Sequence, residues 1–264
     1  DHPVRYFVPN REKDGYGLRR DGVDQVAAMG GNLIITVDNG ITSCDAIDYA
    51  RELGIDVVVT DHHLQEGILP EAEAVINPSR TDSEYPFKSI CGVAVAFKVA
   101  QALGERMLPE EDYKQFLLNQ LDLVAIGTIA DVMPLRDENF AMVKFGLRVL
   151  ANTRKPGLIE LKRISGVKQK QITPISVGYF LAPRLNAAGR MEEASISIEL
   201  LTTDSYERAS QLAAELDMLN RKRQSLQSDY LENALSSFPT DEIPTDKVLF
   251  VENEEWQAGL IGLV

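Results

Sequence analysis

Apolar residues occur along this chain in short runs of strand length that alternate with longer segments of helical spacing. Most of the short runs are continuous rather than alternating, which is typical of parallel strands buried on both faces. Alternation of such strands with helices predicts an α/β fold, with a parallel sheet and helices on both of its faces. The expected strands are Val4–Val8, Leu33–Val37 (as a central strand), Val57–Thr60, Ala74–Ile76 and Val248–Val251.

Amphipathic segments separate these strands and fill most of the second half of the chain. Gly30 and Gly31 close a first short helix, and Ser43 is a candidate N-cap for a second helix that stops at Gly54. One later segment is so apolar that we expect it to be buried. The expected helices are Asp21–Met29, Cys44–Leu53, Gly92–Leu103, Asp112–Ile129 (the apolar one), Phe140–Leu150, Gly157–Ile164 and Ser176–Leu181.

A long polar segment predicts the domain organisation. Ser205–Phe238 has leucines at helical spacing and is flanked by Pro239 and Pro244, so it is interpreted as a helix that connects two domains. The residues after it are too few to fold alone. We therefore expect a main domain over 1–204, a connector helix over 205–238 and the beginning of an accessory domain over 239–264, in a fragment that is cut at both ends.

The candidate chemistry lies where two neighbouring strands end. Asp61, His62 and His63 follow one strand directly, and Asp38 follows the strand before it. Ligands of open α/β sheets bind at the carboxyl ends of the strands, and a right-handed crossover brings both ends to one edge. Carboxylate oxygen with imidazole nitrogen suits Mn²⁺, Zn²⁺ or Fe²⁺ better than Ca²⁺. The DHH tripeptide alone also fits an N-cap aspartate with two surface histidines.

A further carboxylate, Asp131, is the one charged residue in the run from Leu123 to Leu135. An unpaired carboxylate in apolar surroundings is costly, so a partner is expected. A metal ion, an arginine or a helix N-terminus would each serve.

Arginines occur in two irregular stretches that could bind an anion. Arg11 lies in the loop PNREKDGYGL, and Arg184, Asn186 and Arg190 lie in APRLNAAGR. Guanidinium groups match phosphate oxygens bidentately, and small residues between them allow a backbone to approach closely. Solvated loop arginines explain either stretch equally well when it is taken alone.

Composition narrows the class of protein. Its 264 residues, 44% of them hydrophobic, can bury a core, and the net charge of -13 argues against a nonspecific nucleic-acid coat. The charge does not exclude an enzyme that meets phosphates through metal ions and a few arginines. Cys44 and Cys91 are too few for a disulfide framework, and no apolar run could span a bilayer. A cytoplasmic protein without a membrane partner is expected.

Five motifs, in order, closely resemble those of the DHH phosphoesterase superfamily, and within it the single-strand-specific exonucleases. They are PNREKDGYGL, TVDNGI, VVTDHH, GTIADVMPL and APRLNAAGR, and they cover essentially the whole chain. The resemblance implies a hydrolase with two Mn²⁺ or Mg²⁺ ions that degrades single-stranded DNA from its 5′ end, in repair and recombination. It also implies that the accessory domain is of the DHHA1 type, which binds nucleic acid.

The resemblance assigns roles to the acidic and imidazole side chains. Asp38 resembles the carboxylate that bridges the two ions, and His62 and Asp131 resemble ligands of one ion. His63 resembles the histidine that faces the metal or the scissile phosphate. Asp61 would orient His62 from outside the ligand shell.

The arginine stretches acquire a role in the same way. Arg11 and Arg190 match arginines that hold the terminal phosphate of the substrate, and Arg184, Asn186 and His63 are candidate phosphate contacts beside them. Single-stranded DNA is therefore the expected binding partner. The protein is expected to be a monomer. The family also suggests recruitment through a single-strand-binding protein or a helicase.

Two departures from the family pattern matter. Its first motif, an Asp-x-Asp at a strand end, would precede residue 1, so one ion would lose most of its ligands and the activity of this chain alone is in doubt. We expect the chain to bind one Mn²⁺, less tightly as His62 protonates near its reference pKa of about 6.5. Gln257 also stands where a histidine is expected in the Trp-x-x-Gly stretch.

Two alternatives remain at this point. The same chemistry would serve a phosphoesterase for short oligonucleotides or cyclic dinucleotides. A nonenzymatic scaffold with a decayed DHH fold is an alternative of another class. Decay would first remove the metal ligands, because unoccupied ligands cost stability, whereas those visible here are retained.

Overall fold

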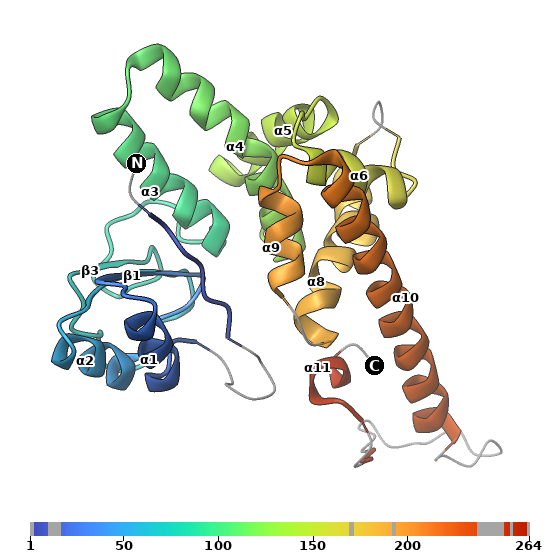
Figure 1. Ribbon diagram of the computed structural model, residues 1–264, viewed down its shortest axis with the longest axis horizontal. Coiled ribbons are helices and arrows are strands. Elements are labelled where there is room, and N and C mark those ends of the chain that lie inside the picture. Colours follow the sequence, from blue (N-terminus) through green and yellow to red (C-terminus); the bar gives the residue numbers. More distant parts are fainter. Residues whose placement is uncertain are drawn as a thin grey trace.

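The computed structural model describes residues 3–9, 17–168, 172–191, 194–236, 251–253 and 256–262. A small parallel sheet with two helices lies on one side of the molecule, and a larger group of helices lies on the other (Figure 1). The prediction of an α/β fold with a parallel sheet is confirmed. No helix of the described residues is long and apolar enough to cross a membrane.

The sheet contains β1 (Leu33–Val37), β2 (Asp56–Thr60) and β3 (Ala74–Ile76) in that order, all parallel. The register pairs the last residue of β1 with the last of β2, and that residue with the last of β3, so all three strands end at one edge. Helices α1 (Arg20–Ala28) and α2 (Cys44–Glu52) pack on one face of the sheet. This arrangement carries the strand-end residues to one edge.

The expectation that Leu33–Val37 is a central strand is wrong for the part of the chain that the structure describes. There β1 pairs only with β2, and alternate side chains of β1 are about half exposed: Leu33 48%, Ile35 53% and Val37 50%. A continuous apolar run indicates that both faces can be buried, but not that a neighbour covers them. The edge strand β1 therefore exposes apolar side chains on one face of the sheet.

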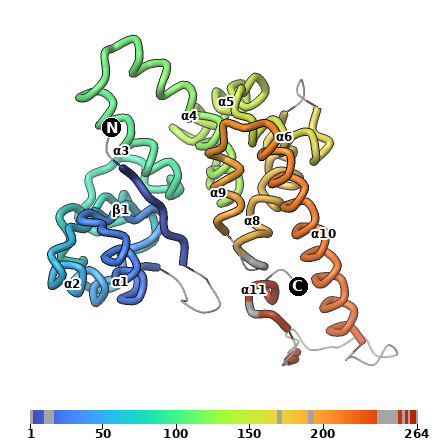
Figure 2. Tube along the Cα trace, viewed as in Figure 1, coloured from blue at the N-terminus to red at the C-terminus, as the bar shows by residue number. Residues whose placement is uncertain are grey.

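Two local predictions also differ from the structure. Val4–Val8 is extended but forms no ladder among the described residues, and appears as an uncoiled run in Figure 2. Instead, the ring of Phe7 packs close to Gly22 of α1. Ser43 stands at the N-cap of α2 without a capping bond from its side chain, because its φ of -91° and ψ of 39° are not the extended conformation that capping requires.

The helical part begins with a hairpin of α3 (Gly92–Met107) and α4 (Glu110–Ala130), and α4 then packs along α5 (Asp137–Ala151). Burial of α4 throughout was expected, but its first half is exposed, with Leu118 at 50%. Only its second half enters the core, because the hairpin projects beyond its neighbours (Figure 1). The end of α4 therefore lies where the sheet and the other helices meet.

Most of the remaining helices, with Ile126 of α4 and Leu150 of α5, build the largest apolar cluster among the described residues. A single turn of π-helix, η2, stands where a helix over Ser176–Leu181 was expected, and α8 continues it directly. Their bounds are α6 (Pro156–Ile164), α7 (Pro174–Ser176), η2 (Val177–Leu181), α8 (Ala182–Met191), α9 (Ser195–Thr202), α10 (Tyr206–Ser236) and α11 (Ala258–Ile261).

The expected connector helix exists as α10 but does not stand apart. It packs against α6, α8 and α9 and buries Leu212 and Leu216 completely or nearly so. It is thus a wall of the helical core as well as the route toward the C-terminal segment. The domain boundaries at 204 and 238 stay predictions, and Val248–Val251 lies almost wholly outside the described residues.

Candidate metal centre

Three carboxylate or imidazole side chains converge at the carboxyl edge of the sheet. Asp38 follows β1 with a left-handed φ of 66°, and its N–H donates to the carbonyl of Thr60 at 3.0 Å, so the backbone still holds to β2. His62 lies two residues beyond β2, and Asp131 follows the last residue of α4. The sequence places these residues on three different elements, and the fold brings them together.

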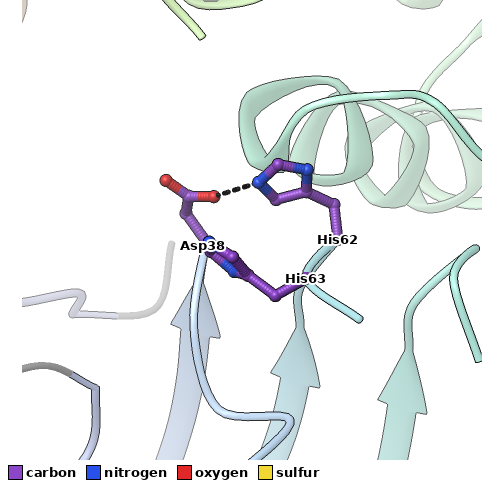
Figure 3. A group of neighbouring side chains, drawn as sticks. All are labelled: Asp38, His62 and His63. Atoms are coloured by element: carbon purple, nitrogen blue, oxygen red, sulfur yellow. Dashed lines mark ion pairs between the residues drawn. The ribbon is translucent and has the colours of Figure 1, made fainter. Parts of the chain in front are cut away.

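The ring of His62 is the centre of this group. Its Nε2 lies 3.0 Å from Asp38 Oδ1 and 3.6 Å from Asp131 Oδ2. The His62 side chain is only 10% exposed, whereas Asp38 and Asp131 remain open to solvent at 58% and 45%. Figure 3 shows Asp38 and His62 facing each other, with His63 beside them. Asp38, His62 and His63 can each offer one ligand atom, all within 4.8 Å of one another.

Asp61 is the buried support of this turn. It is 1% exposed, its Oδ2 accepts from the backbone N–H of Ile41 at 3.0 Å, and its Oδ1 accepts from that of His62 at 2.8 Å. The same Oδ1 lies 2.6 Å from Nδ1 of His63. The carboxylate thus orients the ring of His63, whereas we had expected it to orient that of His62, because the chain folds back directly after β2. With Nδ1 as the donor, His63 keeps Nε2 as an acceptor.

Sequence reasoning missed Asn77, which follows β3 as Asp38 follows β1 and Asp61 follows β2. It is 5% exposed, and its Nδ2 donates to the carbonyl of His63 at 2.9 Å. The strand-end rule that selected the two aspartates could also have found this amide, but only the carboxylates suggested chemistry.

The electrostatics of the group favour a bound cation. The carboxylate of Asp38 accepts a hydrogen bond from His62 and raises the pKa of that imidazole. Burial raises the pKa of Asp131, the negative charge of Asp38 adds to the effect, and His62 opposes it. Burial works to raise the pKa of Asp61, but hydrogen bonds from Ile41, His63 and His62 together lower it. Two carboxylates with an imidazole between them form a mixed oxygen and nitrogen donor set that suits a divalent transition-metal ion such as Mn²⁺.

The predicted phosphate contacts are distributed differently. Arg184 lies on α8, 14% exposed, and its guanidinium pairs with Asp217 of α10 at 2.8 Å and donates to the carbonyl of Phe180 at 2.7 Å. Asn186 is exposed on the same helix. Arg11 and the side chain of Arg190 lie outside the described residues. The structure therefore gathers Asp38, His62, His63 and Asp131, and shows no contact between Arg184 and that group.

Comparison with known proteins identifies relatives across the whole chain. Residues 1–128 match the family described as DHH family, N-terminal domain. The chain is 41% identical over 271 residues to the single-stranded-DNA-specific exonuclease RecJ of Salmonella typhimurium, covering 99% of this chain and 47% of that protein. It is 40% identical over 262 residues to the protein of that name from Bacillus subtilis, covering 99% of this chain and 32% of that protein.

Solved structures agree with these matches. A crystal structure of exonuclease RecJ bound to manganese has a TM-score of 0.83 and 34% identity, over 97% of this chain and 63% of that one. RecJ of Thermus thermophilus in complex with Mn²⁺ has a TM-score of 0.80 and 33% identity, over 93% of this chain and 35% of that one. The chain spans less than half the length of the curated relatives described above.

Proposed function

We propose, from the premise that this chain belongs to the DHH family, that it carries the metal centre of a 5′-to-3′ exonuclease specific for single-stranded DNA. The observation that carries the proposal is the meeting of Asp38, His62 and Asp131 from β1, β2 and α4 around one imidazole nitrogen. Relatives about 40% identical over nearly the whole chain are named as exonucleases of this specificity, which supports the substrate class. Repair and recombination are the processes in which we place the enzyme.

In this proposal Asp38, His62, His63 and Asp131 hold Mn²⁺ or Mg²⁺, the ions described in the solved relatives. Bound ions of this kind activate a water molecule and stabilise the charge that develops on the phosphate. The carboxylates of Asp38 and Asp131 supply the negative charge that retains such ions. His63, whose Nδ1 is held by Asp61, presents Nε2 on a side chain that is 59% exposed, so it can meet a scissile phosphate.

The terminal phosphate of the substrate requires separate contacts, and we assign it to Arg11 and Arg190, on the basis of the family motifs alone. Asn186 is exposed and can contribute there. The pairing of Arg184 with Asp217 instead supports a positioning role, in which Arg184 fixes α8 against α10. A cytoplasmic location, a monomeric state and recruitment by a single-strand-binding protein or a helicase stay predictions.

Substitution of Asp131 tests the metal assignment. In the full-length protein, Asp131→Ala should abolish Mn²⁺-dependent digestion of long single-stranded DNA, whereas Asp112→Ala, at the exposed start of the same helix, should leave it unchanged. Normal digestion by the Asp131 variant would refute the assignment. Equal rates on a dinucleotide and a long strand would indicate a small-substrate phosphoesterase instead.

A further inference from the structure

The first turn of α3 lies against the carboxylate of Asp38 with no room for a side chain. Helix α3 begins at Gly92, and a Cβ atom added there would stand 2.6 Å from both Cβ and Cγ of Asp38 and would also overlap its Oδ1. Real Cβ atoms do not approach other atoms so closely. The backbone of Gly92 therefore forms one wall of the position that the Asp38 carboxylate occupies.

The same turn is packed against α4 on another side. A Cβ atom added at Gly127 would stand 3.0 Å from Cβ of Val93 and would overlap its Cγ1. Cys91 Sγ also lies 3.4 Å from Thr128 Oγ1. Four residues after Gly127 comes Asp131, whose N–H donates to the Gly127 carbonyl at 2.9 Å. The turn thus touches both the carboxylate after β1 and the last turn of α4.

The residues that lead into α3 are buried and hydrogen-bonded, so the start of α3 cannot move away from Asp38. Ile90 and Cys91, which lead into the helix, are each 2% exposed, and the carbonyl of Ser89 accepts from Asn139 of α5 at 2.7 Å. The backbone of Asp38 is held by its bond to Thr60. What can yield to an added methyl group is the Asp38 side chain, and its displacement would break the 3.0 Å contact with His62.

We propose that the first turn of α3 is a spacer of fixed thickness between Asp38 and Asp131, and that Gly92 and Gly127 are positioning residues for these two carboxylates. The proposal rests on the proposed function only in taking Asp38 and Asp131 as metal ligands. Loss of the outer-shell hydrogen bonds that orient a metal ligand lowers metal affinity by about tenfold to a hundredfold, and we expect a methyl group that displaces the ligand to cost a similar amount. The spacer therefore sets how well the carboxylates bind one ion between them.

A double-mutant cycle on the metal-free chain tests the contact itself. Gly92→Ala should lower the thermal midpoint, and adding Asp38→Gly should remove that loss, because the atoms that the methyl group would meet are gone. Gly178→Ala is the matched control, since its Cβ would meet only Ile129 Cγ2 at 3.6 Å, and it should not lower the midpoint. An equal loss in both backgrounds, or failure to fold in both, would overturn the proposal.

Calorimetry with Mn²⁺ tests the consequence for the centre. Gly92→Ala should weaken Mn²⁺ binding by about tenfold or more while Gly178→Ala does not. Gly127→Ala should do the same, and adding Val93→Ala should recover most of the affinity. Unchanged Mn²⁺ binding in both glycine variants would overturn the proposal. If the unsubstituted chain bound no Mn²⁺, the proposed metal centre would fail, and the thermal cycle alone would decide whether Gly92 positions Asp38.

Discussion

Asp61 shows how one buried carboxylate can order two consecutive histidines. Its oxygens accept three backbone N–H groups and face the ring of His63, so Asp61→Asn should cost about 1–3 kcal/mol of stability at neutral pH. Because the folded pKa of Asp61 is lowered, its contribution is present above the unfolded value of about 3.9 and is lost as pH falls through the folded value. Urea unfolding across that range measures the difference.

The exposed Asp56→Asn, at the start of β2, is the control for this prediction and should change stability little. A destabilisation by Asp61→Asn that stayed constant down to the lowest pH would show that the charge of Asp61 is not involved.

His62 gives metal binding a predictable dependence on pH. Its pKa is raised by the hydrogen bond to Asp38, so the proton competes with a metal ion at a pH above the reference value of about 6.5. Mn²⁺ affinity should therefore rise as pH increases through that raised pKa, with release of protons. Calorimetry in buffers of different ionisation enthalpy would detect the release. One Mn²⁺ per chain is expected, and retention of it in His62→Ala would contradict the assignment.

At this scale the sequence predicts positions better than partners. The strand-end rule selected Asp38, Asp61 and His62 because parallel strands share an edge, and the structure brings them to that edge. It could not predict that Asp61 bonds His63, since a single backbone turn decides which ring folds back. Arg184 pairs with Asp217, which lies 33 residues further along the chain. A local sequence pattern cannot predict a contact between residues so far apart in the sequence.

Lys162 of α6 illustrates how the helices are joined. It is 2% exposed, burial lowers its pKa, and its Nζ donates to the carbonyls of Leu150 and Ala151 at the end of α5. Lys162→Met keeps the length of the side chain but removes the buried ammonium that donates to these carbonyls, so it should cost about 1–3 kcal/mol. Chemical denaturation would measure the loss. Lys168→Met, at an exposed position, should not change stability, and equal behaviour of the two variants would refute the role.

The sequence predicted helices and strands well where local periodicity determines them. It predicted them poorly where contacts with residues far away in the sequence determine the structure. The periodicity located α1, α2 and α5 to within a few residues, because an amphipathic stripe and its glycine boundaries are local features. Val4–Val8 has the composition of a strand, but a strand also needs a partner, and Phe7 packs on α1 instead. The same limit explains why the exposed first half of α4 was expected to be buried.

The whole molecule places the candidate metal centre between a small sheet and a helical core, in a chain of net charge -13. A surface of this charge repels a nucleic-acid strand at long range. Attraction of the strand therefore has to come locally, from bound cations and a few arginines. Asp38 and Asp131 contribute to that negative charge and, in the proposed function, reverse its effect by retaining cations. The acidic composition is therefore compatible with an anionic substrate.

The half-exposed face of β1 has a consequence for the behaviour of the chain in concentrated solution. Leu33, Ile35 and Val37 lie on a strand that pairs on one side only among the described residues, and such a strand is a template for pairing with another chain. Light scattering should detect self-association that grows with protein concentration, and Ile35→Lys should suppress it without unfolding the sheet. Undiminished scattering in that variant would show that the chain self-associates through another surface. The resistance of the chain to aggregation thus depends on how well the strand LIITV is covered.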